Sequence, residues 1–306
     1  MALKILPGPH FSERTTLRLG GRAQAEILLE RPEDARDLAG ELSRHASRPF
    51  VLGHGSNLLA KDSDLDLAVV ALAPGEPCLL SEQAGGEPGK RIVRVSGGLM
   101  LPRLVVWAAR KGLSGLEALA GIPGTVGGAV AMNAGSYGRE MAEVLARVQV
   151  WDLAGGARWI TPDQWRAVYR GFTPLSLGDP WIALEAELAL TPADPKAVSA
   201  QISANLAKKR ATQPVDAATC GSAFKNPPSG SGQGLSAGQS AGKMLDELGF
   251  RGKTLGGMGF SPMHANFLVN QGGGSAMAAL ELLDLAREAV RARFGVELEL
   301  EVRVVG

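Results

Sequence analysis

The stretch LAGIPGTVGGAVAMNAGSYG, residues 119–138, holds six glycines and one proline and carries no charged side chain. Because proline and repeated glycines interrupt helices, the stretch is unsuited to crossing a membrane. Glycine permits positive φ angles and lets main-chain N–H groups approach a ligand with no Cβ in the way, as in loops that cradle phosphates. Turns between core strands would have the same composition. The stretch therefore predicts buried main chain, in turns or around a ligand.

The composition of the 306-residue chain is that of a globular protein, with 45% hydrophobic and 21% charged residues. It argues against disorder and against an integral membrane protein. The net charge of +1 gives no overall field that would recruit nucleic acid or a membrane surface. The apolar run before Pro7 is too short for a signal peptide, so we expect a cytoplasmic protein. Cys78 and Cys220 are too few for a cysteine metal site and are expected to be free thiols.

The first 190 residues alternate between strand and helix patterns, beginning with a β-α-β unit. A helix is predicted over 32–45, with proline and acidic residues in its first turn, and another over 101–112, closed by Gly112. Strands are predicted where β-branched and apolar residues cluster, at 25–30, 49–53, 66–72, 91–97, 147–153 and 181–190.

Further along the chain, Asp194 and Pro195 are a typical helix start, predicting a helix that ends near Pro214 and bridges two domains. The segment 227–234 is predicted to be a flexible surface loop, 275–295 a helix and 296–305 a strand. Residues 73–90 are rich in Pro and Gly and mark a loop or boundary. We expect three domains, at residues 1–75, 76–205 and 206–306.

The common nucleotide and metal motifs are missing. No G-x-G-x-x-G follows a predicted strand in a β-α-β setting, and the one GKT sequence, 252–254, has Glu247 where a P-loop requires glycine. The four histidines are scattered without metal-ligand spacing. We therefore expect neither a Rossmann site, nor a kinase site, nor a bound metal.

The segment VLGHGSNLL, residues 51–59, places a strand end directly before Gly53, Gly55, Ser56 and Asn57. The glycines allow close approach of main chain, and the short polar side chains can bond a phosphate. An ordinary polar turn would have the same sequence pattern. Together with residues 119–138, however, the chain offers two glycine-rich turns that could clasp one extended dinucleotide.

These segments resemble the UDP-N-acetylenolpyruvoylglucosamine reductase family. The resemblance extends from end to end, and its blocks occur in the family's order: TTLRLGG (15–21), VLGHGSNLL (51–59), GLSGLEALAGIPGTVGGAVAMNAGSYG (112–138), YR (169–170), CGSAFKNP (220–227), AGKMLDELGFRGKTLGGMGFSPMHANFLVN (241–270) and LEVRVVG (300–306).

The resemblance implies an α+β fold: an FAD-binding fold of the vanillyl-alcohol-oxidase (PCMH) type, made of two α/β subdomains, with a C-terminal α+β domain for substrate. It implies a flavoenzyme of peptidoglycan precursor synthesis. NADPH would reduce FAD and leave, and the enolpyruvyl ether of UDP-N-acetylglucosamine would take its place and become UDP-N-acetylmuramate. The main chain of the two turns would neutralise the FAD pyrophosphate in place of side-chain cations. The residues expected at FAD are Gly53, Gly55, Ser56, Asn57, Gly121, Ile122, Pro123, Gly124, Thr125, Gly127, Gly128 and Ala129, with Asn133, Ala134 and Gly135 nearby.

The resemblance also assigns the chemistry. Ser222 would donate a proton to C2 of the substrate, while Arg170 and Glu301 would polarise its carboxylate. Tyr169, Lys225 and Asn226 would bind substrate. From the residues alone, Ser222 would be read as a turn residue, and Arg170 as part of an ordinary surface pair.

Periodicity cannot choose among the three acids of the predicted last strand, because Glu297, Glu299 and Glu301 share its polar face. Only the family's E-V-R ending singles out Glu301. Two departures from the family pattern are Gly-Phe-Thr after Arg170, where a serine usually stands two residues later, and His54, which is often glycine. The first puts the surroundings of Arg170 in doubt.

The short interval between Arg170 and Ser222 resembles the compact subtype, without the inserted tyrosine loop. Basic residues that are candidates for the diphosphate, or equally for solvated surface charges, are Lys225, Lys243, Arg251 and Lys253. Two alternatives remain: an FAD-dependent oxidase on the same scaffold, and a nucleotide-binding protein without catalysis. The expected partners are the UDP-sugar substrate and NADPH, with no nucleic acid or membrane, and the expected state is a monomer.

Overall fold

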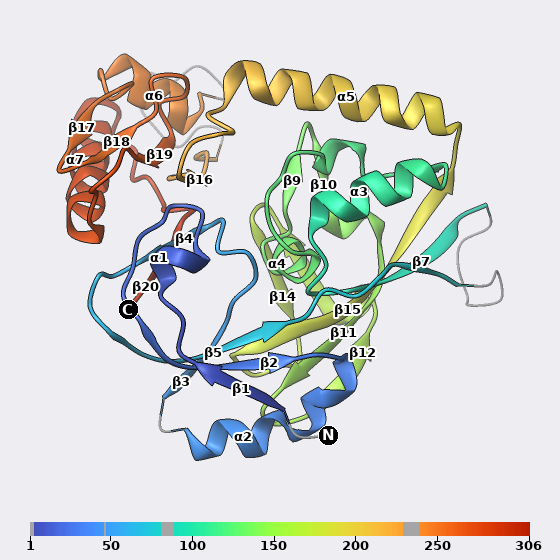
Figure 1. Cartoon of the computed structure of the whole chain (residues 1–306). Coiled ribbons are helices and arrows are strands. Elements are labelled where there is room, and N and C mark those ends of the chain that lie inside the picture. Colours follow the sequence, from blue (N-terminus) through green and yellow to red (C-terminus); the bar gives the residue numbers. More distant parts are fainter. Residues whose placement is uncertain (1–2, 46, 81–88, 229–238) are drawn as a thin grey trace. The chain divides into compact units, whose positions relative to one another are not determined.

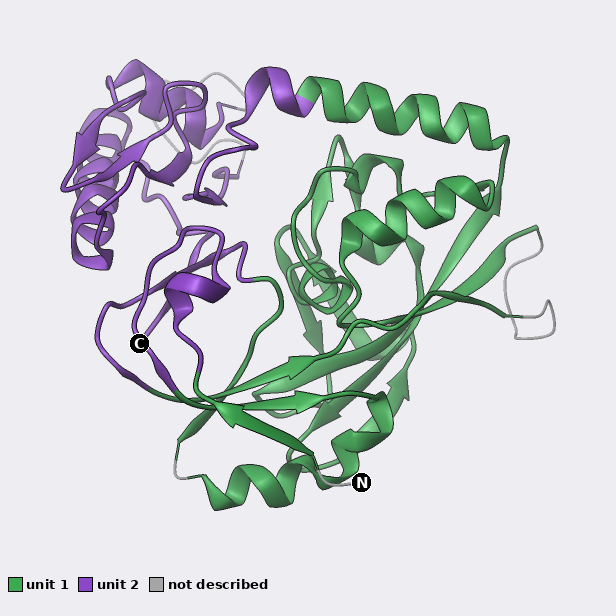
Figure 2. Cartoon of the chain, in the orientation of Figure 1, with its two compact units in different colours: residues 1–8, 24–54, 66–208 green, residues 9–23, 55–65, 209–306 purple. Residues whose placement is uncertain are grey.

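The computed structural model describes residues 3–45, 47–80, 89–228 and 239–306. The chain forms two compact units, each assembled from separated segments (Figure 2). Unit 1 consists of residues 1–8, 24–54 and 66–208, and unit 2 of residues 9–23, 55–65 and 209–306. The first 65 residues therefore contribute to both units. The expected division into three domains is a different subdivision and stays a prediction.

The first sheet of unit 1 has the strand order β1-β2-β5-β3 (Figure 1). Its strands at 25–30, 49–53 and 66–72 were predicted and are confirmed, whereas the predicted helix at 32–45 begins as a 3-10 helix. Buried side chains such as Ile27, Leu38 and Trp151 form its core. The elements are β1 (Lys4–Pro7), β2 (Ala23–Leu29), η1 (Pro32–Asp37), α2 (Leu38–Arg44), β3 (Arg48–Val51) and β5 (Leu65–Leu72).

The second sheet of unit 1 has the order β12-β11-β15-β7-β6, and β8 pairs with β15 at one end. The strands predicted at 91–97, 147–153 and 181–190 belong to it, and the helix predicted at 101–112 packs with it through Leu104, Val148 and Leu188. The elements are β6 (Cys78–Leu79), β7 (Arg91–Ser96), α3 (Leu101–Arg110), β8 (Leu113–Ser114), α4 (Val126–Ala131), β11 (Leu145–Asp152), β12 (Gly156–Ile160) and β15 (Trp181–Pro192).

Smaller elements of unit 1 carry the loops that matter below. They are η2 (Glu117–Leu119), the hairpin of β9 (Gly135–Ser136) and β10 (Arg139–Glu140), η3 (Met141–Val144), η4 (Pro162–Gln164), and the hairpin of β13 (Trp165–Val168) and β14 (Gly171–Pro174).

Helix α5 (Pro195–Thr212) is the helix predicted from Asp194 and Pro195. The Asp194 side chain accepts a hydrogen bond from the Lys196 N–H at 3.1 Å, which satisfies a main-chain donor of the first turn. The division between the two units falls inside this helix, between Lys208 and Lys209. Residues of this one helix are thus assigned to both units, and a bridge between the expected domains stays a prediction.

Unit 2 is built on a four-stranded sheet of order β16-β19-β18-β17, covered by helix α7. Helix α7 starts where Ser275 accepts from the Ala278 N–H and ends at Gly295, whose φ of +66° suits glycine. In the core of unit 2, Leu17 and Leu59 pack together with Phe224 and Leu282. The elements are α1 (Phe11–Arg14), β4 (Leu58–Ala60), β16 (Thr219–Ser222), α6 (Ala241–Glu247), β17 (Thr254–Leu255), β18 (Met258–Phe260), β19 (Phe267–Asn270), α7 (Ala276–Phe294) and β20 (Arg303–Val305).

The strand predicted at 296–305 is wrong for most of its length, because only β20 forms, pairing in parallel with β4. The chain bends at 301–302, so the alternation changes phase: Val304 is 39% exposed and Val305 is buried. The bend follows hydrogen bonds to Ala223 O from the N–H groups of Glu301 and Val302. The loop predicted at 227–234 lies mostly outside the described residues.

Candidate functional site

The two glycine-rich turns meet in unit 1 at Gly53 and Thr125. A Cβ atom on Gly53 would lie 2.6 Å from Thr125 Oγ1, so this contact has room only for glycine. Thr125 caps α4, because its Oγ1 accepts from the Gly128 N–H at 3.2 Å. The remaining residues of the first turn, 55–57, are assigned to unit 2. Gly53 of the first turn and Thr125 of the second are therefore in contact, as is needed if the two turns are to hold one dinucleotide between them.

The second turn presents main chain to solvent on one side and buries apolar side chains on the other. Gly121, Pro123 and Gly128 are exposed, while Val126 and Val130 are fully buried. The prediction of buried main chain is therefore only half right. Gly121 and Gly124 have φ of +74° and +136°, which a residue with a Cβ rarely adopts. The exposed side is a surface of bare main chain.

Hydrogen bonding inside the chain already uses several N–H groups of this turn. Ile122 donates to Leu119 O, Val126 to Leu99 O and Gly127 to Gly97 O. Gly128 and Ala129 both donate to Thr125. The N–H groups of 126–129 therefore already have partners within the chain, and a ligand would contact this segment mainly through its surface.

Asn133 has a buried side chain that is fully engaged within unit 1. It is 1% exposed and has φ of +41°. Its Nδ2 donates to Glu140 Oε2 at 2.7 Å and to Val168 O at 3.0 Å, and its Oδ1 accepts from the Ala142 N–H. The side chain thus ties the glycine-rich stretch to the end of β13 instead of facing outward.

Arg170 is the second residue of the tight turn between β13 and β14, where Val168 pairs with Gly171. Its φ of +56° is unusual for a residue with a side chain, and such conformations persist where the surrounding structure enforces them. Its Nη1 donates to Gly135 O at 3.2 Å, and its guanidinium lies 4.9 Å from the Tyr169 ring centre. Gly171 pairs regularly, so the atypical Gly-Phe-Thr sequence continues a hairpin. Arg170, Tyr169 and Gly135 are thus brought together in unit 1.

Unit 2 brings together Ser222, Glu301 and Asn57. Ser222 is the last residue of β16, and the carbonyl of the next residue, Ala223, accepts from the Glu301 N–H at 2.8 Å. Asn57 Nδ2 donates to Glu301 O at 2.9 Å, and Asn57 O accepts from the Arg303 N–H at 3.0 Å. Segments from three distant parts of the chain are therefore held together by hydrogen bonds, one of them from the Asn57 side chain.

The structure gives different surroundings to Glu297, Glu299 and Glu301, which periodicity could not distinguish. Glu297 accepts from Arg287 at 2.8 Å, and Glu299 pairs with Lys225 at 3.1 Å. Both are exposed, whereas Glu301 is half-buried beside the Ser222 segment. The three acids therefore have different surroundings, and the role expected of Glu301 stays a prediction.

The predicted substrate and diphosphate residues have varied surroundings. Lys225 contacts Glu299, and Asn226 Oδ1 accepts from the Ala241 N–H at the start of α6. Arg251 pairs with Asp246 and donates to the carbonyls of Pro262 and Met263, so it holds a loop in place. Lys243 and Lys253 are exposed.

Burial perturbs the titratable groups of this region. It raises the pKa of the Cys220 thiol to about 12, with a smaller contribution from Glu301, so the thiol stays protonated. Burial, and then the nearby Arg251 charge, lower the pKa of His264. His264 is therefore neutral near pH 7, and its Nδ1 accepts from the Asn266 N–H.

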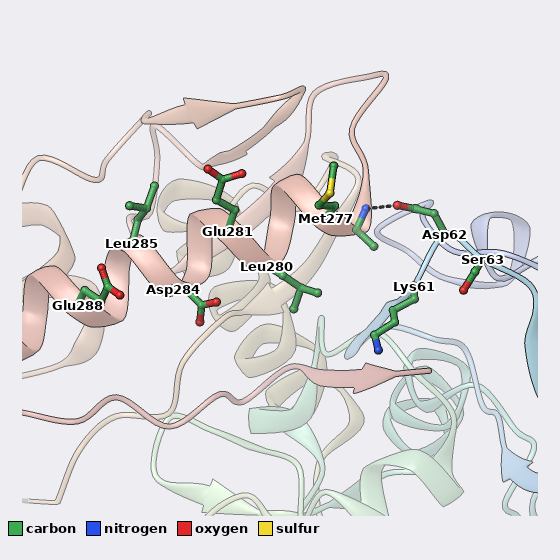
Figure 3. Close-up of a pocket in the computed structure, with 10 residues that line it drawn as sticks. Lys61, Asp62, Ser63, Met277, Leu280, Glu281, Asp284, Leu285 and Glu288 are labelled. Carbon is green, nitrogen blue, oxygen red and sulfur yellow. Dashed lines mark hydrogen bonds between the residues drawn. The ribbon is translucent and has the colours of Figure 1, made fainter.

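Unit 2 also contains a cavity of about 640 Å³, and Figure 3 shows the side chains that line it. Asp62 Oδ2 accepts from the Ala276 N–H at 2.8 Å beside it. The acidic side chains of this cavity have the wrong charge for binding a diphosphate, and none of the predicted site residues lines the cavity. The lining consists of Lys61, Asp62, Ser63, Ala276, Met277, Leu280, Glu281, Asp284, Leu285 and Glu288.

Over 3–45, 47–80, 89–228 and 239–306, no three His, Cys, Asp or Glu side chains are grouped so that they could hold a metal ion. Among the helices of these residues, none is both long and apolar enough to cross a membrane. Both cysteines are free, Cys78 exposed and Cys220 buried, as predicted.

Comparison with known proteins gives consistent matches along the chain. A family model described as FAD binding domain matches residues 23–161, and one for the C-terminal domain of UDP-N-acetylenolpyruvoylglucosamine reductase matches residues 213–305. The reductase of Nitratidesulfovibrio vulgaris is 44% identical over 99% of both chains. That of Bacillus subtilis is 34% identical over 99% of this chain and 94% of its own.

A solved structure agrees with these matches. The crystal structure of the Thermus caldophilus reductase superposes with a TM-score of 0.78 at 33% identity, covering 99% of this chain and 100% of that one. The expected fold class, an α+β chain with this type of FAD-binding fold, is thereby confirmed.

Proposed function

Since the chain belongs to the UDP-N-acetylenolpyruvoylglucosamine reductase family, we propose that it reduces the enolpyruvyl ether of UDP-N-acetylglucosamine to UDP-N-acetylmuramate with electrons from NADPH. The family makes it an FAD-dependent oxidoreductase of peptidoglycan precursor synthesis. In the proposed reaction Ser222 donates the proton to C2, and Arg170 and Glu301 act on the substrate carboxylate.

The residues present fit FAD. Gly53 and Thr125 touch so closely that no side chain could separate the two turns, and Gly121 and Gly128 leave bare main chain exposed beside them. Because the N–H groups of 126–129 are already engaged, we assign the pyrophosphate contacts mainly to the turn 53–57. When bound, FAD would supply the redox chemistry of the proposed reaction, passing a hydride from NADPH through N5 to C3 of the enolpyruvyl group.

Arg170 suits the charge that develops during the reaction. Hydride addition at C3 leaves negative charge at C2, which is shared with the carboxylate. A guanidinium can donate two parallel hydrogen bonds to that carboxylate and stabilise the charge. The positive φ of Arg170 and its bond to Gly135 O fix the direction in which the side chain leaves the turn. Tyr169, 44% exposed, is positioned with it to contact substrate.

The observation that carries the proposal is the link between the Ser222 segment and Glu301. Because Ala223 O accepts from the Glu301 N–H, the proposed proton donor and the proposed carboxylate partner are held in one fixed arrangement. A serine hydroxyl is a weak acid, so it transfers its proton as negative charge builds up at C2. Lys225 and Asn226 follow on the same segment and are proposed to contact substrate.

The test is an anaerobic experiment in two steps. NADPH should bleach the visible bands of the bound flavin, and UDP-N-acetylglucosamine enolpyruvate should then restore them promptly. In Ser222→Ala, bleaching should be nearly unchanged, whereas restoration should slow by roughly 100-fold to 10,000-fold, as for loss of a positioned acid. Ser63→Ala, which removes an exposed hydroxyl elsewhere in unit 2, is the control and should restore at nearly the wild-type rate.

Two outcomes would contradict the proposal. If the flavin recovers only when oxygen is admitted, the chain behaves as an oxidase and the substrate assignment fails. If Ser222→Ala slows both steps equally, Ser222 is not the proton donor.

The remaining expectations concern the state of the protein in the cell. We infer a cytoplasmic monomer that takes only small-molecule partners, consistent with the near-neutral net charge of +1. Sedimentation equilibrium at micromolar concentration tests the monomer directly, and a mass that doubles with concentration would contradict it.

A further inference from the structure

Asn266 makes three hydrogen bonds to the segment that follows Ser222. It lies just before β19 and is 3% exposed. Its Oδ1 accepts from the Phe224 N–H at 3.0 Å, and its Nδ2 donates to Phe224 O at 2.8 Å. Its own carbonyl accepts from the Ala223 N–H at 2.7 Å. The amide orientation is determined by these partners, because the opposite one would set donor against donor.

The position of these bonds explains why a side chain is needed there. Strands β16 and β19 pair at Thr219 with Val269 and at Ser222 with Phe267, with an irregularity between them. The ladder stops at Ser222, where β16 ends, so Phe224 has no strand partner in β19. The Asn266 side chain supplies the missing donor and acceptor, which a buried main chain requires.

The same segment also carries Glu301. Ala223 O accepts from the N–H groups of Glu301 at 2.8 Å and of Val302 at 3.3 Å. Ala223 is therefore held on one side by Asn266 and on the other by the Glu301 segment. A shift of Asn266 would move the main chain between Ser222 and Lys225 and, through Ala223, that of Glu301.

Asn266 is itself held rigidly. Its N–H donates to His264 Nδ1 at 3.2 Å, and the His264 ring packs 4.8 Å from that of Phe267. Arg251 bonds the carbonyls of Pro262 and Met263 in the same loop. The asparagine thus belongs to a fixed support, as expected of a residue that positions others.

We propose that Asn266 is a positioning residue for the protonation step, holding Ser222 and Glu301 in their working arrangement. This inference rests on the proposed function. It assigns Asn266 no contact with substrate or FAD. Small displacements of reacting groups reduce rates steeply, by about 100-fold for 1 Å. Loss of the Asn266 bonds should therefore slow flavin reoxidation by substrate and spare flavin reduction by NADPH.

The test is Asn266→Asp, followed through both flavin steps between pH 5 and 8. A protonated aspartic acid has an oxygen acceptor and an O–H donor where asparagine has its oxygen and amide, whereas the ionised form sets a charge against Phe224 O. Relative to wild type at each pH, reoxidation should be about 100-fold slower at pH 8 and recover as the pH falls. Reduction by NADPH should match wild type throughout.

The matched control is Asn270→Asp. Asn270 lies in the same unit, and its side chain also bonds to main chain. Its Nδ2 donates to Leu17 O, and its Oδ1 accepts from the Gly272 N–H. Its side-chain bonds do not include the 222–226 segment, so its reoxidation should follow wild type at every pH. If Asn266→Asp is not recovered folded, Asn266→Ser, which keeps a small acceptor toward the Phe224 N–H, is measured in the same way.

The inference is overturned if the Asn266 variants reoxidise like wild type at all pH values, or if both flavin steps slow in parallel. Failure of wild type to reoxidise with the enolpyruvyl substrate would instead remove the proposed function, and this inference with it. The two failures are therefore distinguishable in one set of traces.

Discussion

Asn57 donates a hydrogen bond from Nδ2 to the main-chain oxygen of Glu301 at 2.9 Å, across 244 positions of sequence. The residue expected to contact the cofactor thereby holds the residue expected to act on the substrate. This bond couples two roles that the sequence assigns to separate motifs.

Asn57→Ala should therefore affect more than cofactor binding. Loss of the bond should destabilise unit 2 by about 1 kcal/mol and slow reoxidation of the flavin by substrate. Asn205→Ala removes a comparable bond, from Nδ2 to Glu117 O at 2.8 Å in unit 1, and should cost similar stability with normal reoxidation. Denaturant unfolding and the two flavin steps measure both effects. Equal reoxidation in the two variants would show that the Asn57 bond has no part in the reaction.

Gly53→Ala should weaken retention of FAD, because the new Cβ would lie 2.6 Å from Thr125 Oγ1 and force the turns apart. The ratio of flavin to protein absorbance after gel filtration measures retention. In the double variant with Thr125→Ala, the clash is removed and retention should partly return. Gly40→Ala is the control, since a Cβ there would meet no described atom within 4 Å apart from its chain neighbours and the backbone of its own helix. Undiminished retention in Gly53→Ala would argue against the clasp of two turns.

Arg170→Lys should keep a positive charge but lose the planar pair of donors, so turnover should fall by roughly 100-fold. Most of the loss should appear in reoxidation by substrate, with the rate of reduction by NADPH little changed. Arg166→Lys, an exposed arginine on the same hairpin, serves as the comparison and should remain close to wild type. An Arg170→Lys enzyme with full turnover would exclude bidentate carboxylate binding.

Asp152 should make unit 1 sensitive to acid. Hydrogen bonds from Arg158, against the opposing effect of burial, hold the pKa of its carboxyl at about 2, helped by the N–H groups of Gly155 and Gly178. Because the pKa in the folded protein lies below the ordinary aspartate value of 3.8, the stabilisation is complete above that pH and is lost as the pH falls toward 2.

The variant Asp152→Asn should accordingly be less stable by about 2 kcal/mol at pH 7, and the difference from wild type should shrink below pH 4. Urea unfolding at several pH values measures it, with Asp64→Asn, an exposed carboxylate, as the comparison. A difference that stays constant down to pH 2 would show that packing, and not ionisation, is the cause.

Local chemistry determined much of this protein from sequence alone. Helix starts at Asp194 and Ser275 and the helix end at Gly295 were predictable, because capping needs only neighbouring residues. The positions of the glycine-rich turns and the order of the family blocks were likewise visible in the chain. The strands β2, β3, β5, β7, β11 and β15 of unit 1 followed from their apolar clusters. The predicted last strand failed because contacts with Ala223, far away in the sequence, bend the chain at 301–302.

Tertiary structure alone decided which side chains face inward and which acids differ. Periodicity places Glu297, Glu299 and Glu301 on one face. It does not reveal which groups each of them contacts, which in the folded chain are Arg287, Lys225 and the Ala223 carbonyl respectively. Nor does anything in the sequence mark Asn133 and Asn266 as buried clamps, since asparagine is usually exposed. These roles depend on hydrogen bonds between segments that only the folded chain brings within reach.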